Sequence, residues 1–373
     1  MLTLASVRRA IDGLQAEVFV VDNASSDGSA DRVRSDAPWV KLIALHENVG
    51  FSRANNQAMA VCSGRVVTIL NPDTIVPLSF FRQLIEHFDS NPDSGAVGVR
   101  MINGRGAYLR ESKRGYTDLL TSFFKLTGMW HLAPKSATIN AYYVGQCSEG
   151  GTCKAPILSG ACMSFSHQLM DKVGFFDPQY FMYSEDIDLS WRMDLASNGN
   201  NTYRGDLCII HFKGQSTPRR KEYIGYFYDS MLLFARHYEY PRHNKIVNAL
   251  THLGIKAAYS LAVAKCTILR CLERSRTFVQ PRKVAFVTRS EVNSSRFRDS
   301  LPSDVACDVY SDNLMEIDEE LYDAVVFDID YNLLGSIECM KTKVGQTNFG
   351  FYNPDDNQAL VFFNNRCHNI LKS

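Results

Sequence analysis

The chain has 373 residues, which is enough for two or three domains with sizeable cores and excludes a small disulfide-stapled scaffold. It carries 40 Lys and Arg residues against 40 Asp and Glu residues, and 45% of its residues are hydrophobic. This ordinary globular composition argues against wholesale disorder and against a general nucleic-acid-coating role, so we expect no nucleic-acid partner.

Targeting and redox signals favour a cytoplasmic protein. The hydrophobic residues never run for the roughly 18 positions needed to cross a bilayer, and the amino end lacks a basic-then-apolar signal segment. Ten scattered cysteines without a CxxC pair predict reduced, mostly buried thiols rather than a disulfide framework or a zinc site. Cys147 and Cys153 flank a Gly-rich loop and could bridge, but we favour the reduced state.

Short β-rich runs alternate with helical stretches in the first half of the chain. The predicted strands are Glu17–Val21, Lys41–Leu45 and Val66–Leu70, and the predicted helices are Ser29–Ser35, Ser52–Val61 and Leu78–Phe88. This β-α-β alternation predicts a mainly parallel sheet. Each strand delivers polar residues at its carboxyl end, which is the edge where open α/β sheets bind ligands.

The amino end departs from that alternation. Residues 1–14 have the apolar spacing of a helix, yet no strand precedes them. A crossover helix needs a strand to cross from, so we expect that the chain start cuts into a domain.

A second boundary is expected near Pro241. Residues 248–274 repeat apolar side chains at helical spacing, with basic side chains on the other side. This basic amphipathic helix could lie on an anionic membrane surface or pack on its own domain with a solvated basic face. After Pro281, we predict the strands Lys283–Thr288, Val305–Tyr310 and Ala324–Asp328 and the helix Ser295–Ser300, forming a small α/β domain. The predicted division is therefore 1–240, 241–280 and 281–373.

Three loops after the predicted strands carry polar groups suited to a nucleotide. The turn from Asp22 to Ser29 offers carboxylates and an amide to a base and ribose, although taken alone it favours an ordinary capped turn. Asn48 and Gly50 precede a helix start, whose N–H groups suit a diphosphate. Asp73, after Asn71 and Pro72, is either a hard oxygen ligand for Mg²⁺ or Mn²⁺ or a solvated side chain in an Asn-Pro turn.

An acidic helix start follows an aromatic loop over residues 175–182. Ser184 is the expected N-cap, and Glu185, Asp186 and Asp188 fall in the first turn, where the helix dipole favours negative charge. Helix capping explains the acids, but the aromatic side chains suggest a sugar or other ring bound beside a general base. His211, at a strand end, could complete a metal site or be a partly buried histidine.

The motifs in chain order resemble a known family. VVDNASSDGS, NVGFSRANNQAM, LNPDT, LSGACMSF, VGFFDPQYFMYSEDIDLSWRM and HFKGQS together resemble the family 2 inverting glycosyltransferases with a GT-A fold, particularly the bacterial rhamnosyltransferase-like branch. The resemblance covers about residues 5–240. It implies a GT-A nucleotide-diphospho-sugar transferase fold with a mainly parallel central sheet, followed by the small carboxyl-terminal α/β domain.

The resemblance also implies residue roles. Asp186 matches the catalytic base, with Glu185 beside it. Asp73 matches the last acid of the family's metal-binding motif, and His211 is the expected second ligand of Mg²⁺ or Mn²⁺. The nucleotide-sugar contacts are expected at Asp22, Asn23, Ser25, Asp27, Asn48, Gly50, Asn55 and Asn71.

The implied reaction moves a sugar from a nucleoside-diphosphate sugar, of the dTDP-rhamnose or UDP-sugar type, to a hydroxyl of a polysaccharide or lipid-linked acceptor. We expect this at the inner face of the plasma membrane, in cell-surface polysaccharide biosynthesis, with peripheral membrane contact through residues 248–274. Relatives begin with a strand that this chain lacks, so a sheet edge should be exposed. The alternative is a truncated or degenerate member that binds nucleotide or partners without turnover.

Overall fold

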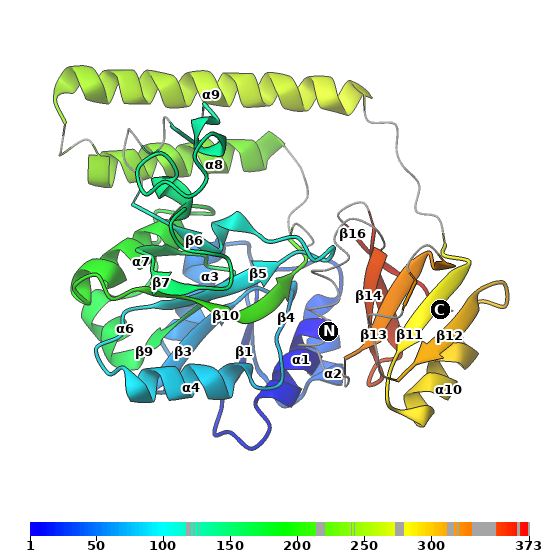
Figure 1. Cartoon of the computed structure of the whole chain (residues 1–373). Helices are drawn as coiled ribbons and strands as arrows, with labels where there is room; N and C mark the ends of the chain where they lie inside the picture. The colour runs from blue at the N-terminus through cyan, green and yellow to red at the C-terminus, as the bar shows by residue number, and fades with distance from the viewer. Residues whose placement is uncertain are drawn as a thin grey trace.

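The computed structural model describes most of the chain. The described residues are 1–116, 121, 124–125, 127–213, 221–239, 241, 243–272, 280–311, 317–318, 321–329, 348–363 and 366–371. They form an amino-terminal α/β region, a carboxyl-terminal sheet beside it, and a pair of helices above the amino-terminal region (Figure 1).

The first two strands form a small sheet of their own. β1 (Phe19–Asp22) and β2 (Lys41–Ala44) pair in parallel, joined by α2 (Ser29–Asp36). Neither strand is hydrogen-bonded to the larger sheet that follows. Val18 beside β1 and Val66 of the next strand instead pack against one hydrophobic cluster. In the described residues β1 thus has a single strand partner, so the expected sheet edge is present.

A six-stranded sheet forms the centre of the amino-terminal region. Its strands follow the order β3-β9-β5-β10-β4, with β7 on β10. Their bounds are β3 (Val66–Leu70), β4 (Thr74–Ile75), β5 (Val97–Ile102), β7 (Thr152–Lys154), β9 (Cys162–Ser166) and β10 (Thr202–His211). The α/β class is as predicted, but this sheet is mixed rather than mainly parallel. β9 runs antiparallel to β3 and β5, and β10 is parallel to β5 alone. The regular β-α-β alternation ends after α4, and the longer connections beyond it allow antiparallel pairing.

Helices cover this sheet. They are α1 (Leu2–Ala10), α3 (Phe51–Met59), α4 (Phe80–Ser90), α6 (His167–Val173) and α7 (Glu185–Ala196). Phe80, Leu84 and Phe88 lie on one face of α4 at helical spacing and are buried against β5. A long connection carries the 3-10 turns η1 (Arg110–Ser112), η2 (Met129–His131) and η3 (Ala141–Tyr143), and the short pair β6 (Lys113–Arg114) and β8 (Ile157–Leu158).

The carboxyl-terminal sheet contains the strands predicted after Pro281. β11 (Lys283–Val287), β12 (Ala306–Tyr310), β13 (Ala324–Asp328) and β14 (Asn348–Asn353) are parallel in the order β12-β11-β13-β14. β15 (Gln358–Phe363) and β16 (Arg366–Asn369) continue it antiparallel, and α10 (Glu291–Ser300) packs on one face. The other face shares one hydrophobic cluster with α1 and the six-stranded sheet, in which Phe212 contacts Phe351 and Phe362.

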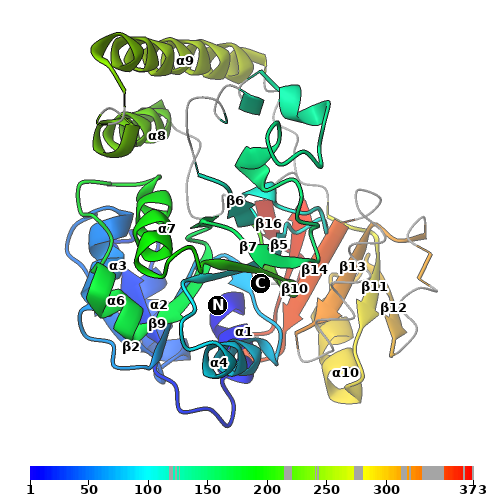
Figure 2. The same ribbon diagram turned by 60° about the vertical axis from the view of Figure 1, so that its left-hand side comes forward.

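Two helices lie above the amino-terminal region. α8 (Lys221–Phe234) continues into a π-helical turn (Ala235–Glu239), and α9 (Lys245–Leu272) packs along α8. Both views place α8 between α9 and α7 (Figures 1 and 2). The predicted helix over 248–274 is therefore present through residue 272, and Arg274 lies outside the described residues.

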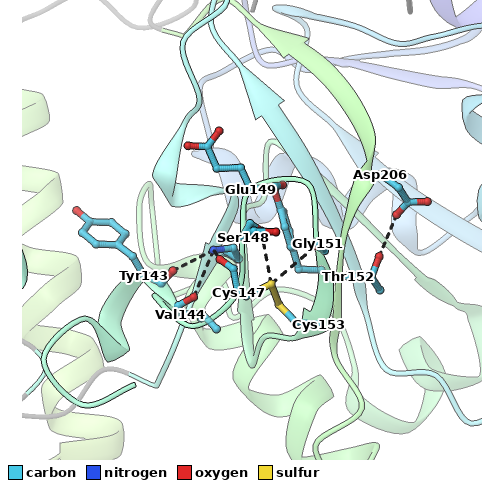
Figure 3. Close-up of a disulfide and its surroundings, with 11 residues drawn as sticks. Tyr143, Val144, Cys147, Ser148, Glu149, Gly151, Thr152, Cys153 and Asp206 are labelled. Atoms are coloured by element: carbon cyan, nitrogen blue, oxygen red, sulfur yellow. Dashed lines mark hydrogen bonds between the residues drawn. A yellow bond between two sulfur atoms is a disulfide. The ribbon is translucent and has the colours of Figure 1, made fainter. Parts of the chain in front are cut away.

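A disulfide joins Cys147 and Cys153, whose Cα atoms are 6.3 Å apart (Figure 3). The expectation of a reduced pair is wrong for these two residues, because the Gly150-Gly151 turn between them brings the chain back on itself. Cys62, Cys162, Cys266 and Cys307, also among the described residues, have free thiols.

Candidate functional site

The loops after β1 and β2 are tied together by two asparagines predicted to contact the nucleotide. Asn23 Nδ2 donates to Asn48 Oδ1 at 2.8 Å, and Val49 N donates to Asn23 Oδ1 at 2.9 Å. Asn48 Oδ1 also accepts from Gly50 N at 3.0 Å. These amide hydrogen bonds fix the shape of the two loops. Asp22 lies beside them at the end of β1, and its carboxylate accepts from the backbone N–H of Ser25 at 3.1 Å.

The remaining residues of that predicted set differ in their surroundings. Asp27 is exposed and accepts from the Ser29 backbone at 3.0 Å, at the start of α2, and the Ser29 hydroxyl and backbone N–H hold its pKa below the usual range. Asn55 bonds to the Phe51 carbonyl within its own helix, at 2.9 Å. Its neighbour Asn56, which was not predicted, makes two bonds to the Phe176 backbone at 2.8 and 3.1 Å. Asn56 thus fixes the aromatic loop to α3.

Gly50 allows the aromatic loop to approach. Its φ is +84°, and a Cβ at this position would lie 2.5 Å from the Phe181 carbonyl oxygen. That carbonyl accepts from Phe51 N at 2.7 Å. Only glycine tolerates both the left-handed backbone and the contact, so the turn after β2 and the aromatic loop form one wall.

The predicted metal ligands lie side by side. β4 pairs with β10 so that Thr74 lies opposite His211, and Phe212 N donates to the Asp73 carbonyl at 2.9 Å. This register brings His211 Nε2 within 3.2 Å of Asp73 Oδ1, and the two side chains are 9% and 8% exposed. Asn71 is joined to the neighbouring loop, where its N–H donates to the Ala161 carbonyl at 2.9 Å.

The Asp73 and His211 pair fits a divalent cation. Asp73 Oδ1 and His211 Nδ1 are buried and have no hydrogen-bond partner. A carboxylate oxygen beside an imidazole nitrogen suits Mn²⁺ or Mg²⁺. The described residues contain no cluster of three or more metal-binding side chains, so such an ion would take further ligands from phosphate oxygens and water. Cys367 lies nearby, but burial and the Asp73 charge raise the pKa of its thiol to about 12, which keeps it neutral.

The predicted base is positioned by the loop between β8 and β9. Gly160 N donates to Asp186 Oδ2 at 3.2 Å, and a Cβ on Gly160 would lie 2.9 Å from the Asp186 Cβ. The same loop binds Asn71, so a single turn of chain, residues 159–161, connects the loop of Asp73 with Asp186. The structure therefore joins the two predicted halves of the site through the backbone.

Ser184 precedes α7 as expected, but its side chain does not cap the helix. It and Tyr183 have positive φ values of 63° and 70°, and Ser184 Oγ lies 2.9 Å from Ser230 Oγ on α8. Two successive non-glycine residues in this region store backbone strain directly before Glu185 and Asp186.

Glu185 and Asp186 have opposite environments. Glu185 is buried and its Oε2 has no partner. Burial, and next the charge of Asp186, raise the pKa of Glu185 well above its usual range. Asp188 has other partners: it accepts from Arg192 Nη2 at 2.7 Å, one turn further along α7, and from the Tyr238 hydroxyl at 2.5 Å.

The match to a known family covers the part of the chain that holds the nucleotide loops, Asp73 and the residue 159–161 turn. Residues 2–174 match the sequence model described as Glycosyl transferase family 2. This region is a family 2 glycosyltransferase domain. Curated relatives include an N-acetylglucosaminyl-diphospho-decaprenol L-rhamnosyltransferase of Mycobacterium tuberculosis, 25% identical over 216 residues, which are 54% of this chain and 68% of the relative.

A second relative is a poly-beta-1,6-N-acetyl-D-glucosamine synthase of Staphylococcus aureus, 26% identical over 186 residues, or 48% of this chain and 39% of the synthase. A solved structure of a mannosyltransferase from Pyrobaculum calidifontis, in complex with GDP-Man and Mn²⁺, is similar over 74% of this chain and 71% of that chain, with 16% identity and a TM-score of 0.43. The family and the relatives make this chain a glycosyltransferase of GT-A fold, and they favour sugar transfer over a fold without turnover.

The glycosyltransferase carries aromatic side chains of α8 against the aromatic loop that precedes α7. Phe181 and Tyr226 have ring centroids 4.7 Å apart, and Tyr183 and Phe227 form an edge contact at 5.7 Å. Tyr226 and Phe227 are partly exposed. Aromatic faces of this kind suit the apolar faces of sugars, which agrees with the aromatic pattern noted in the sequence.

Sequence reasoning missed the segment that crosses the site from the other side. η1 and β6 place Glu111 in an ion pair with Lys213, two residues beyond His211, and place Arg114 against Asp186. Nothing in the local sequence marks residues 110–114, because their contacts are 72 to 102 positions away along the chain.

Proposed function

We propose that this glycosyltransferase inverts configuration while moving a sugar from a nucleoside-diphosphate sugar, of the dTDP-rhamnose or UDP-sugar type, to a hydroxyl of a lipid-linked or polysaccharide acceptor. The observation that carries the proposal is the convergence of three groups. The residue 159–161 turn is bonded to Asn71, close to the pair Asp73 and His211, and to Asp186. The nucleotide loops contact the aromatic loop that leads into Glu185 and Asp186, through Gly50 and Phe181. The relative named as a decaprenol-linked rhamnosyltransferase supports this donor and acceptor class.

The residues of the chain divide the chemistry between them. Asp186 accepts the proton of the acceptor hydroxyl, whose oxygen attacks the anomeric carbon from the face opposite the diphosphate. Asp73 and His211 would hold Mg²⁺ or Mn²⁺, which offsets charge on the leaving diphosphate. Asp22, Asn23, Ser25, Asp27, Asn48, Gly50, Asn55 and Asn71 form the nucleotide-sugar side, directly or by shaping its loops.

Calorimetry with UDP and dTDP, each with Mn²⁺, tests the binding half of this proposal. We expect Asp73→Asn to weaken Mn²⁺-dependent nucleotide binding, because it removes the charged ligand. Asp186→Asn should leave that binding within about twofold and lower sugar transfer by about 10²–10⁴-fold. Asp171→Asn, an exposed acid on α6, is the control and should change neither. Unchanged metal dependence in Asp73→Asn would refute the ligand role.

We also propose that α9 contacts the cytoplasmic face of an anionic membrane. Over Lys245–Ala264 the helix is long and apolar enough to cross a membrane, although the sequence was expected to contain no such segment, and none of it is buried. Ile246, Leu250, Leu253 and Leu261 are among its exposed side chains. A lipid-facing helix above the aromatic side chains of α8 would bring a lipid-linked acceptor to the catalytic loop.

Vesicle flotation tests this contact. The protein should float with vesicles containing phosphatidylglycerol and less with phosphatidylcholine alone, because the helix carries basic residues. Leu250→Glu combined with Leu253→Glu should abolish flotation by charging the apolar face. Leu321→Glu, an exposed leucine outside the helix, is the control. Flotation that survives the double change would show that α9 is not the contact.

The division into residues 1–240, 241–280 and 281–373 remains our proposal for the functional units. In it, the first unit carries transfer, the second the membrane contact, and the third supports the first through the shared hydrophobic cluster.

A further inference from the structure

Arg114 is a buried cation in direct contact with the proposed base. Its Nη2 donates to Asp186 Oδ2 at 2.6 Å, and the two side chains are 11% and 16% exposed. The same nitrogen lies 3.5 Å from the Leu158 carbonyl. β6 pairs with β8 with Arg114 opposite Ile157, so the backbone that carries Arg114 is fixed by the strand that leads into the residue 159–161 turn.

Two adjacent carboxyl groups lie near this contact, and Arg114 forms an ion pair with only one of them. Glu185 and Asp186 are adjacent at the start of α7, and Arg114 is the cationic side chain that the described residues place in contact with either of them. Arg192 forms an ion pair with Asp188, which also accepts from Tyr238. Lys213 forms an ion pair with Glu111. Two neighbouring carboxylates in a buried site cannot both ionise cheaply, so a cation on one of them determines where the negative charge resides.

The surroundings of Arg114 keep it charged. Burial alone would lower its pKa, but Asp186, and to a lesser degree Tyr142, raise it above the usual value for arginine. Burial would likewise raise the pKa of the Tyr142 hydroxyl, but Arg114 and Lys125 bring it below its usual value. Arg114 therefore remains a fixed positive charge over the working pH range.

We propose that Arg114 is a positioning residue that keeps Asp186 ionised and oriented, so that the single negative charge of the Glu185 and Asp186 pair resides on Asp186. With Gly160 N, it occupies Oδ2 of Asp186 and so fixes the plane of the carboxylate. Glu185, buried and without a partner on Oε2, then remains a neutral acid. This inference deepens the proposed function, because it rests on Asp186 as the base.

Infrared spectroscopy of the protonated-carboxyl stretch tests the charge assignment without any substrate. In the full chain at neutral pH, Glu185→Gln should remove one protonated-carboxyl signal, and Asp186→Asn should remove none. On acidification, the signal that depends on Asp186 should appear at a pH about 1–3 units higher in Arg114→Met than in the unmodified chain. Arg114→Lys, which restores a charge, should shift it less.

The control is Arg110→Met, an exposed arginine of the same segment that stacks over Trp130 and does not contact the acidic pair. Arg114→Gln is the second variant if the methionine variant does not fold. An unshifted Asp186 titration in either neutral variant, or a neutral-pH signal that depends on Asp186 rather than Glu185, would overturn the proposal.

The pH dependence of nucleotide release gives a second readout, with dTDP-rhamnose and UDP-N-acetylglucosamine as probes. The acid limb of the pH–rate profile for nucleotide release should move to higher pH in Arg114→Met, by the same interval as the infrared titration. A limb that does not move would count against the positioning role. Absence of turnover with sugar nucleotides would count against the proposed function, and the infrared titration would still decide the role of Arg114.

Discussion

At the scale of single residues, two adjacent carboxyl groups show how much the surroundings determine the chemistry. Asp186 Oδ2 accepts from the Arg114 guanidinium and from Gly160 N, and its Oδ1 accepts from Ile187 N. Glu185 is instead buried, and its Oε2 has no hydrogen-bond partner. Residue type alone does not distinguish two acids in a helix start, and only the family resemblance singled out Asp186. Burial raises the pKa of Glu185, whereas Asp186 is paired with a guanidinium, and this difference supports our proposal of Asp186 as the base and Glu185 as a neutral acid.

The buried Glu185 makes stability depend on pH. Its pKa is raised from the ordinary 4.5 to about 8, so between these values the folded protein binds more protons than the unfolded chain. Stability should therefore fall as pH rises from about 4.5 to about 8, and Glu185→Gln should remove this loss. Denaturant unfolding at pH 5 and pH 8 measures it, and we expect the glutamine variant to gain at least about 1 kcal/mol relative to the unmodified chain over that interval.

Glu86→Gln, an exposed glutamate on α4, is the matched control for that experiment. It should follow the unmodified chain at both pH values. Equal pH dependence in Glu185→Gln and the unmodified chain would show that Glu185 is ionised in the folded protein.

At the residue scale, the sequence indicated which side chains lie close together where a motif places its own side chain at a strand end, and their role as metal ligands stays a prediction. Asp73 and His211 were predicted together, and they are 3.2 Å apart because β4 and β10 pair in one register. Arg114 and Asn56 were not predicted, because their partners are distant along the chain. Ser184 was predicted as a helix cap by residue type, but its hydroxyl is turned toward Ser230 instead.

At the scale of elements, strands and helices were predictable but their pairing was not. Residues 19–22, 41–44 and 66–70 are strands where apolar runs end in polar turns. The direction of β9 depends on a connection of more than 50 residues after β5, which no local pattern describes. The disulfide between Cys147 and Cys153 was not predicted for a similar reason, since it depends on how the Gly150-Gly151 turn folds.

Hydrogen exchange tests the isolation of β1. In a parallel pair only alternate N–H groups of a strand face its partner, so half of the amides of Phe19–Asp22 point away from β2. These amides should exchange about tenfold or more faster than those of Val97–Ile102 in β5, which has a partner on both sides. Equal protection in the two strands would show that the free edge of β1 is covered in solution.

At the scale of the whole molecule, the two large sheets share a core. One hydrophobic cluster contains Leu2 of α1, Ile210 of β10 and Phe351 of β14. A Cβ on Gly104 would lie 2.4 Å from the Phe362 ring, so the chain after β5 approaches β15 closely. Such packing couples the sheets, and we expect them to unfold together.

Truncation of Phe362 tests this coupling. Phe362→Ala removes a ring that is 2% exposed between the sheets, and should cost about 3–5 kcal/mol. Calorimetry should show one transition moved to lower temperature, because both sheets lose the same contact. Phe81→Ala, a partly buried ring on α4 away from the carboxyl-terminal sheet, is the comparison. Two separated transitions in the unmodified chain would contradict a shared cooperative unit.

The separate β1 and β2 sheet has a consequence for ligand affinity. One end of a sugar nucleotide would rest on loops of this small sheet and the other on Asp73, which belongs to the six-stranded sheet. Hydrophobic packing rather than a hydrogen-bond ladder holds the two sheets in alignment. A bound donor would act as a clamp across them, and part of its binding free energy would be spent on restricting their relative motion. Donor binding and the rigidity of the amino-terminal region are therefore thermodynamically coupled.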